Sequence, residues 1–162
     1  MNTCNESITI EAIELKSLGL VSCTKTKKDY RCKASEMYSA SDLFRKAYAY
    51  CMKKYHNVAI LSAKYGLLLP IEEIEPYDVT LNNMSIDQVK KWSDQVFQQF
   101  LVKIELNGLG KVYLHAGKRY RQYLIPMLEK MDIKCEVPLK NLKIGKQLEW
   151  YNTHLDCLEN TC

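Results

Sequence analysis

The 162-residue chain lacks the motifs that identify several common classes of protein. It has no apolar run of the length that a membrane-spanning helix requires, so we expect no spanning segment and no membrane partner. It contains neither a G-x-x-x-x-G-K-[ST] phosphate loop nor a G-x-G-x-x-G dinucleotide fingerprint. No cluster of Asp, Glu, His or Cys has the spacing of metal ligands, so the sequence predicts no metal and no cofactor.

Cysteine and charge patterns exclude further classes. The seven cysteines are odd in number and form no C-x-x-C pair, and we recognise no secretory signal ahead of them, which favours reduced thiols in a cytoplasmic protein. The net charge of +4 is compatible with an anionic partner but falls short of the dense basic surface of an obligate duplex binder. A content of 47% hydrophobic residues suits one globular domain spanning residues 1–162.

Predicted strands and helices alternate along the chain. Apolar runs at residues 18–23, 58–61, 111–116 and 134–137 have the length of buried strands. Helical periodicity follows Ser41, Ser85, Tyr120 and Ile144; Ser85 and Gln88 fit a capping box, and the glycines at 108 and 110 end that helix. This order predicts an α/β fold, a three-layer α/β/α arrangement with a mainly parallel sheet of four to five strands. Residues 1–16 form a possible edge strand or extension.

Parallel strands point the same way, so the segments that follow them meet along one edge of the sheet, where ligands bind. Here those segments are residues 24–25 with the basic loop behind them, 62–66, 117–119 and 138–145. They carry Lys25, Lys64, Lys118 and Arg119, and Gly117 stands where a helix begins, so that free amides favour phosphate or carboxylate. The sequence therefore predicts an anion-binding pocket at this edge.

The site prediction covers one catalytic and twelve binding residues. The catalytic candidate is Asp78, which follows a Pro-Tyr pair. The ligand-binding candidates are Ser22, Cys23, Lys25, Ser62, Lys64, Tyr65, Gly66, Tyr77, Gly117, Lys118, Arg119 and Gly145.

Each candidate also has a structural interpretation. The glycines can supply turns, the tyrosines can be packing residues, and Asp78 can make an Asx-type turn. Cys23 is either a packed core residue or a nucleophile whose pKa is lowered by the lysines at 25, 27 and 28. Among the histidines only His115, at the end of the third predicted strand, is a candidate for the site.

The motifs carry a family resemblance. Ser22-Cys23-Thr24-Lys25, YSASDLFR at 38–45, LSAKYGLL at 61–68, PYDVTL at 76–81, AGKRY at 116–120 and residues 137–150 follow the order seen in a family of small bacterial and phage proteins that is catalogued as a domain of unknown function. The resemblance runs from about residue 18 to residue 151. The segment from LSAKYGLL to PYD also resembles the YaaA peroxide-stress proteins, which are associated with DNA binding and protection from oxidative damage. Their helix-hairpin-helix segment has no counterpart here.

A looser similarity connects this group to domains attached to enzymes of tRNA deazapurine modification, so the resemblance implies a nucleotide or nucleic-acid partner. Two functions follow. The first is an enzyme that hydrolyses or transfers at an N-glycosidic bond of a nucleotide or a nucleic-acid base, as a glycosylase does. In it, Asp78 would stabilise the positive charge on the sugar, Tyr65 or Tyr77 would stack on the base and the basic residues would hold phosphate. The alternative is a non-catalytic protein that binds nucleic acid or a signalling nucleotide in a stress response or in phage–host conflict.

Overall fold

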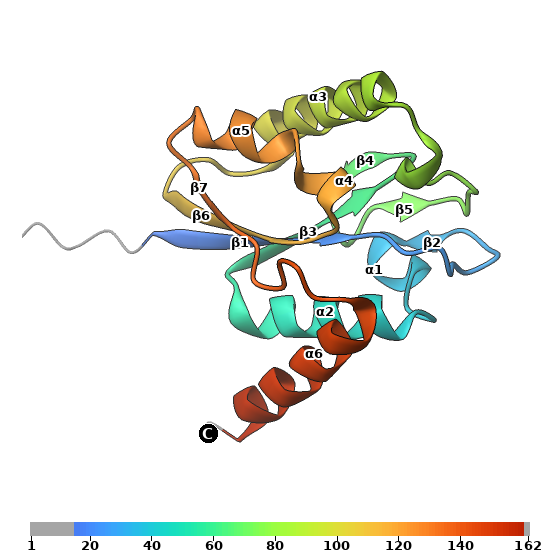
Figure 1. The fold of residues 1–162 in the computed structure, drawn as a ribbon, viewed down its shortest axis with the longest axis vertical. Coiled ribbons are helices and arrows are strands. Elements are labelled where there is room, and N and C mark those ends of the chain that lie inside the picture. The colour runs from blue at the N-terminus through green and yellow to red at the C-terminus, as the bar shows by residue number, and fades with distance from the viewer. Residues whose placement is uncertain (1–14, 161–162) are drawn as a thin grey trace, which may run out of the picture.

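The computed structural model describes residues 15–160, and the predicted α/β architecture is confirmed (Figure 1). The elements in chain order are β1 (Lys16–Ser22), β2 (Cys32–Lys33), α1 (Ala34–Met37), α2 (Asp42–Lys54), β3 (Asn57–Ser62), β4 (Gly66–Leu68), β5 (Glu73–Ile74), the 3-10 turn η1 (Leu81–Asn83), α3 (Ile86–Lys103), β6 (Leu109–His115), α4 (Lys118–Arg121), α5 (Leu124–Glu129), β7 (Lys134–Glu136) and α6 (Ile144–Glu159). Residues 1–14 of the possible edge strand or extension lie outside the described residues.

The central sheet has the strand order β4-β3-β1-β6-β7. Strands β3, β1, β6 and β7 are parallel, and β4 is antiparallel to β3. In the register of β1, Ser22 lies beside Leu61 of β3 and Val21 lies beside His115 of β6. The strands therefore end side by side, and the segments that follow β1, β3 and β6 start from adjacent points.

Helices cover both faces of this sheet. Helix α2, which follows β1, lies on one face with α6, whereas α4 and α5, which follow β6, lie on the other face with α3 (Figure 1). The chain thus leaves β1 and β6 toward opposite faces. In a doubly wound sheet, the two connections part at such a point and leave a crevice between them.

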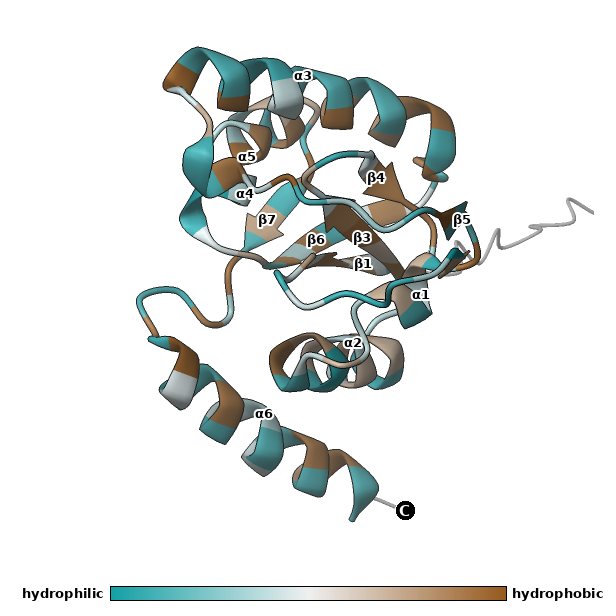
Figure 2. Ribbon diagram, turned by 90° about the vertical axis from the view of Figure 1, so that its right-hand side faces the viewer, coloured by the Kyte–Doolittle hydropathy of each residue, from teal (hydrophilic) through white to brown (hydrophobic). Residues whose placement is uncertain are grey.

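The core forms where apolar strand residues meet the helices. Four of the seven residues of β1 and five of the six residues of β3 are buried, and the strands at the centre of the sheet are strongly apolar (Figure 2). Ser41 caps α2 by accepting a hydrogen bond from the backbone N–H of Phe44. Both hydrogen bonds of the predicted capping box between Ser85 and Gln88 are present at the start of α3. Along residues 15–160 no helix combines the length and apolar character that a membrane span requires.

Two boundaries differ from the prediction. Helix α3 ends at Lys103, not at Gly108, because Ile104 takes an extended backbone and the chain turns back so that Ile104 and Leu106 pack on the core. The helical pattern after Tyr120 contains two short helices, and Pro126 is the third residue of α5. Its missing N–H costs no hydrogen bond there, because the first four amides of a helix have no partner within it.

Candidate functional site

A cavity of 280 Å³ lies at the crevice between the carboxyl ends of β1 and β6. We call it the His115 hollow. Its lining residues are Val21, Ser22, Cys23, Thr24, Leu43, Phe44, Ala47, Leu114, His115, Ala116, Gly117, Lys118, Arg121, Val137, Leu139, Asn141, Leu142, Ile144, Gln147 and Tyr151. They come from β1, α2, β6, α4, α6 and the segment between β7 and α6, so three of the four predicted convergent segments meet here.

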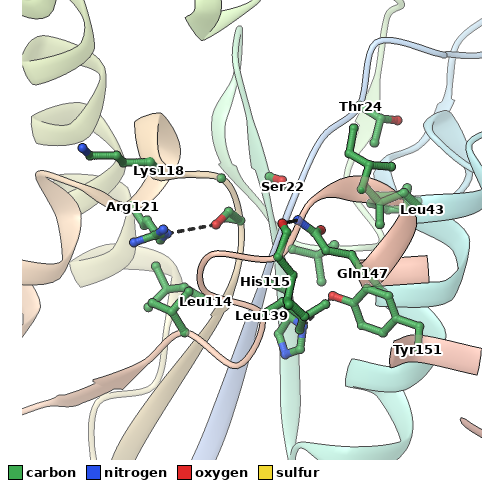
Figure 3. A pocket seen from close by; sticks show the side chains of 18 of the residues that line it. Ser22, Thr24, Leu43, Leu114, His115, Lys118, Arg121, Leu139, Gln147 and Tyr151 are labelled. Carbon is green, nitrogen blue, oxygen red and sulfur yellow. Dashed lines mark hydrogen bonds between the residues drawn. The ribbon is translucent and has the colours of Figure 1, made fainter. Parts of the chain in front are cut away.

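The polar groups of the His115 hollow lie on opposite sides of it. Figure 3 shows Lys118 and Arg121 on one side and Gln147 on the other. The Arg121 side chain donates from Nε to the carbonyl of Ala116 at 3.2 Å, which leaves its two terminal nitrogens as further donors. Gln147 donates from Nε2 to the carbonyl of Leu142 at 2.8 Å. Because that acceptor fixes the orientation of the amide, Oε1 of Gln147 is the atom that can accept a hydrogen bond from a ligand.

His115 forms part of the inner wall and is held by two tyrosines. Its Nε2 lies 2.7 Å from the hydroxyl of Tyr55, and its Nδ1 lies 2.7 Å from the hydroxyl of Tyr151. Burial lowers the pKa of His115 to about 4, so the ring is neutral near pH 7. A neutral imidazole has one donor and one acceptor nitrogen, so one tyrosine donates to His115 and the other accepts from it. His115 therefore orients α6 against the sheet rather than supplying charge to the cavity.

A second cavity, of 510 Å³, adjoins the first. We call it the Asp78 hollow. It is lined by Cys23, Thr24, Lys25, Lys27, Asp78, Val79, Thr80, Asn82, Asn83 and Tyr120. Cys23 and Thr24 line both cavities and form the boundary between them. Asp78 is exposed and shares this hollow with Lys25 and Lys27.

A network of hydroxyl groups lies at the end of β3. The hydroxyl of Tyr77 lies 2.7 Å from that of Tyr38 and accepts a hydrogen bond from Ser62 at 2.9 Å. Ser62 in turn accepts from the backbone N–H of Tyr65 at 3.1 Å. Burial raises the pKa of Tyr38 to about 12 and also raises the pKa of Tyr77, so both hydroxyls stay neutral. Ser62 and Tyr77 thus stabilise the end of β3 without lining either hollow.

Cys23 is buried beside this network. Its Sγ lies 3.4 Å from the hydroxyl of Tyr120, whose pKa is raised by burial. Tyr120, not Tyr65 or Tyr77, is the tyrosine that lines the Asp78 hollow. The ammonium of Lys27 lies over the ring of Tyr77, 4.5 Å from the ring centroid. The structure therefore places Tyr77 beneath a cation rather than open to a stacking base.

Other predicted residues lie apart from the two hollows. Lys64 lines a separate cavity, and the hydroxyl of Tyr65 donates to the carbonyl of Glu75 at 3.4 Å. Gly66 has a positive φ of 77° and makes the turn into β4, which is its structural interpretation. Arg119 donates to the carbonyls of Leu81 at 3.1 Å and Met84 at 2.9 Å, so it fixes the wall of the site and does not project into it.

The two remaining glycines differ in position. Gly117 lines the His115 hollow and precedes α4, which has only four residues and therefore a small helix dipole. Gly145 is the second residue of α6 and does not line any of the hollows described here. The positive charge at this edge thus comes from the side chains of Lys25, Lys27, Lys118 and Arg121 more than from helix amides.

Sequence reasoning did not select Arg121, Gln147, Tyr120 or Lys27 as site residues. Arg121 stands one helical turn after Lys118, and Gln147 stands two residues after the segment predicted to converge, so extending each segment by one turn would have found both. Within residues 15–160 no group of three or more His, Cys, Asp or Glu side chains is placed to hold a metal ion.

Comparison with known proteins gives one match. Neither the curated proteins nor the solved structures contain a significant match to this chain. The model of the family of unknown function DUF6884 matches residues 18–153, close to the range over which the motifs show a resemblance. That range includes most of β1, most of α6, all elements between them and every residue that lines the two hollows. The chain therefore belongs to the family of unknown function DUF6884.

Proposed function

We propose that this protein binds a nucleotide across the two joined hollows and hydrolyses its N-glycosidic bond. The observation that carries the proposal is the contrast between the hollows on either side of Cys23 and Thr24. The first combines aliphatic side chains and Phe44 with several polar groups, as a base requires, and the second is lined mainly by polar residues, two of them lysines, as a sugar phosphate requires. The combined volume of the two hollows falls within the range of about 300–1,000 Å³ that is typical of ligand pockets.

The polar groups of the His115 hollow fit guanine. Oε1 of Gln147 can accept from the amine and N1–H on one edge of the base. On the opposite side, the terminal nitrogens of Arg121 can donate to O6 and N7, the pairing that arginine makes most often with guanine. Lys118 adds a second donor on that side. Adenine has an amine where guanine has O6 and has neither N1–H nor the 2-amino group, whereas hypoxanthine, the base of IMP, lacks only the 2-amino group, so each loses at least one of these contacts.

With the base in the His115 hollow, the sugar lies over Cys23 and Thr24, and the phosphate meets Lys25 and Lys27. Asp78 then faces the sugar. A water molecule forms a bond from its oxygen to C1′ as the C1′–N bond breaks, and the base leaves with the electron pair of that bond. Asp78 accepts the proton of the water, the departing base takes up a proton from solvent, and the carboxylate stabilises the positive charge on the sugar in the transition state.

A binding role without chemistry is the second candidate, and the exposed position of Asp78 favours it. A carboxylate that faces solvent beside two lysines is well solvated, whereas a general base gains reactivity from a drier site. The resemblance of residues 61–81 to the YaaA proteins supports a nucleic-acid setting for either candidate.

Titration calorimetry and release of free base together test the proposal. We expect GMP to bind at least about tenfold more tightly than IMP or AMP, because IMP lacks one of the two donors to Oε1 of Gln147 and AMP lacks both of them as well as the O6 acceptor for Arg121. Asp78→Asn should lower release of guanine at least about a hundredfold and change the affinity for GMP by less than about threefold. Asp94→Asn, an exposed carboxylate of α3 outside both hollows, is the matched control and should leave both unchanged.

Binding without base release in the unmodified protein would select the non-catalytic role. Absence of binding of all three nucleotides at millimolar concentration would contradict the proposal as a whole.

A further inference from the structure

We infer that the ligand is the unpaired end of a single-stranded nucleic acid, which continues from the nucleotide site across a third cavity. This inference rests on the proposed function, because it extends the same site. The third cavity, of 380 Å³, is lined by Ala63, Lys64, Val79, Met84, Gln88, Lys91, Trp92 and Gln95. We call it the Lys64 hollow. Val79 lines both it and the Asp78 hollow, so the three cavities follow one another along the carboxyl edge of the sheet.

The three hollows share one electrostatic feature. Each is lined by two cationic side chains. Lys118 and Arg121 line the first, Lys25 and Lys27 the second, and Lys64 and Lys91 the third. Asp78 is the one carboxylate among the residues that line these three described cavities. A mononucleotide leaves the third pair unused, whereas a longer strand brings its next phosphate to it.

The Lys64 hollow also has a neutral donor. Oε1 of Gln88 accepts from the backbone N–H of Ser85 at 2.8 Å in the capping box, so its Nε2 is the atom that can donate to a ligand oxygen. The ammonium of Lys64 lies 5.3 Å from the centroid of the Tyr65 ring, which keeps this lysine near the sheet edge. A surface that binds a phosphate backbone presents cations and neutral donors and no carboxylates. The residues that line the Lys64 hollow have this composition.

Val79, which lines both the second and the third hollow, offers an apolar contact to a nucleobase. Val79 is 38% exposed there, an apolar side chain in a polar surface. Arg119 holds the segment that follows Val79 through its two hydrogen bonds to the carbonyls of Leu81 and Met84. The first base must enter the His115 hollow and is therefore unpaired, which excludes the interior of a duplex and selects a strand end or a single-stranded segment.

A length series tests this inference against the proposed function. The probes are single-stranded DNA oligonucleotides of two to five nucleotides with guanosine at either end, compared with GMP and titrated into the Asp78→Asn protein at two salt concentrations. Affinity should rise at least about fivefold from GMP to a trinucleotide and then level off. The slope of log affinity against log salt should steepen by about 0.7 for the added phosphate.

Charge variants locate the added contact. Lys64→Gln combined with Lys91→Gln should remove the gain of the trinucleotide and leave GMP affinity within about twofold. Lys54→Gln combined with Lys130→Gln changes the net charge equally at exposed positions outside the three hollows, and it should retain the gain.

Equal affinity for GMP and the trinucleotide would overturn this inference and leave the proposed function standing. An equal loss in both double variants would also overturn it, because the added affinity would then be a general charge effect. Absence of binding to GMP and to every oligonucleotide would contradict both proposals.

Discussion

His115 shows how a single residue links the cavity to the stability of the fold. The ring sits 6% exposed between the hydroxyls of Tyr55 on one side of the core and Tyr151 of α6 on the other. A charged imidazolium would donate from both nitrogens and would need acceptors at both, in an apolar setting that penalises the charge. His115 is therefore a structural residue that burial keeps neutral and that connects Tyr55 to Tyr151 of α6.

The pH dependence of unfolding follows from this position. Burial lowers the folded-state pKa of His115 to about 4, and the unfolded chain has a histidine pKa of about 6.5. Between these values the unfolded state binds the proton more tightly, so stability falls as pH drops from about 6.5 to 4, by roughly 3 kcal/mol in total.

Urea unfolding of the wild type and of His115→Gln at intervals across this window measures the effect. The variant should lose this part of the slope and keep the remainder, which comes from carboxylates. Parallel stability curves for the two proteins would contradict the assignment.

At the scale of elements, two glycines differ in what the fold requires. The turn into β4 requires a glycine at position 66, whereas helix α6 does not require one at position 145. Gly66 enters β4 with a positive φ, and the amide of Gln99 holds both sides of it by accepting from the N–H of Leu67 at 2.8 Å and donating to the carbonyl of Tyr65 at 3.0 Å. A Cβ on Gly66 would overlap Oε1 of Gln99. A Cβ on Gly145 in α6 would have no atom within 4 Å.

The two Gly→Ala variants should therefore differ in sign. Gly66→Ala should lower the free energy of unfolding by about 3 kcal/mol, since it combines left-handed strain with the loss of at least one hydrogen bond. Gly145→Ala should raise it by up to about 1 kcal/mol, because alanine restricts the unfolded chain and favours a helix. Thermal and urea unfolding measure both. A neutral Gly66→Ala variant would show that this turn is not constrained as described.

The elements with strong periodic patterns were predictable from the sequence, and the short ones were not. The four parallel strands and the capping box at Ser85 and Gln88 appear where the patterns placed them. Strand β4 was missed because its three residues carry no periodicity, and its pairing depends on a turn at Gly66 and on the distant Gln99. Propensity over a short window does not report such tertiary contacts.

For the whole molecule, the sheet topology does more than any one motif to place the site. The chain leaves β1 and β6 toward opposite faces, and the crevice at that point holds the His115 hollow. The sequence predicted convergence at this edge, because parallel strands require it. It could not show that Lys118, Lys25 and Lys64 would line three successive hollows, or that Arg119 would bond to backbone carbonyls, because side-chain directions depend on packing between distant segments.

The most direct test of the account is a nitrogen–proton correlation spectrum of the Asp78→Asn protein titrated with GMP. The account predicts saturable shifts of the backbone amides at residues 22–27 and 117–121 and of the side-chain amide of Gln147, since these groups surround the two joined hollows. Shifts confined to the opposite edge of the sheet, around Asn57 and Leu109, or no shifts at millimolar GMP, would contradict it.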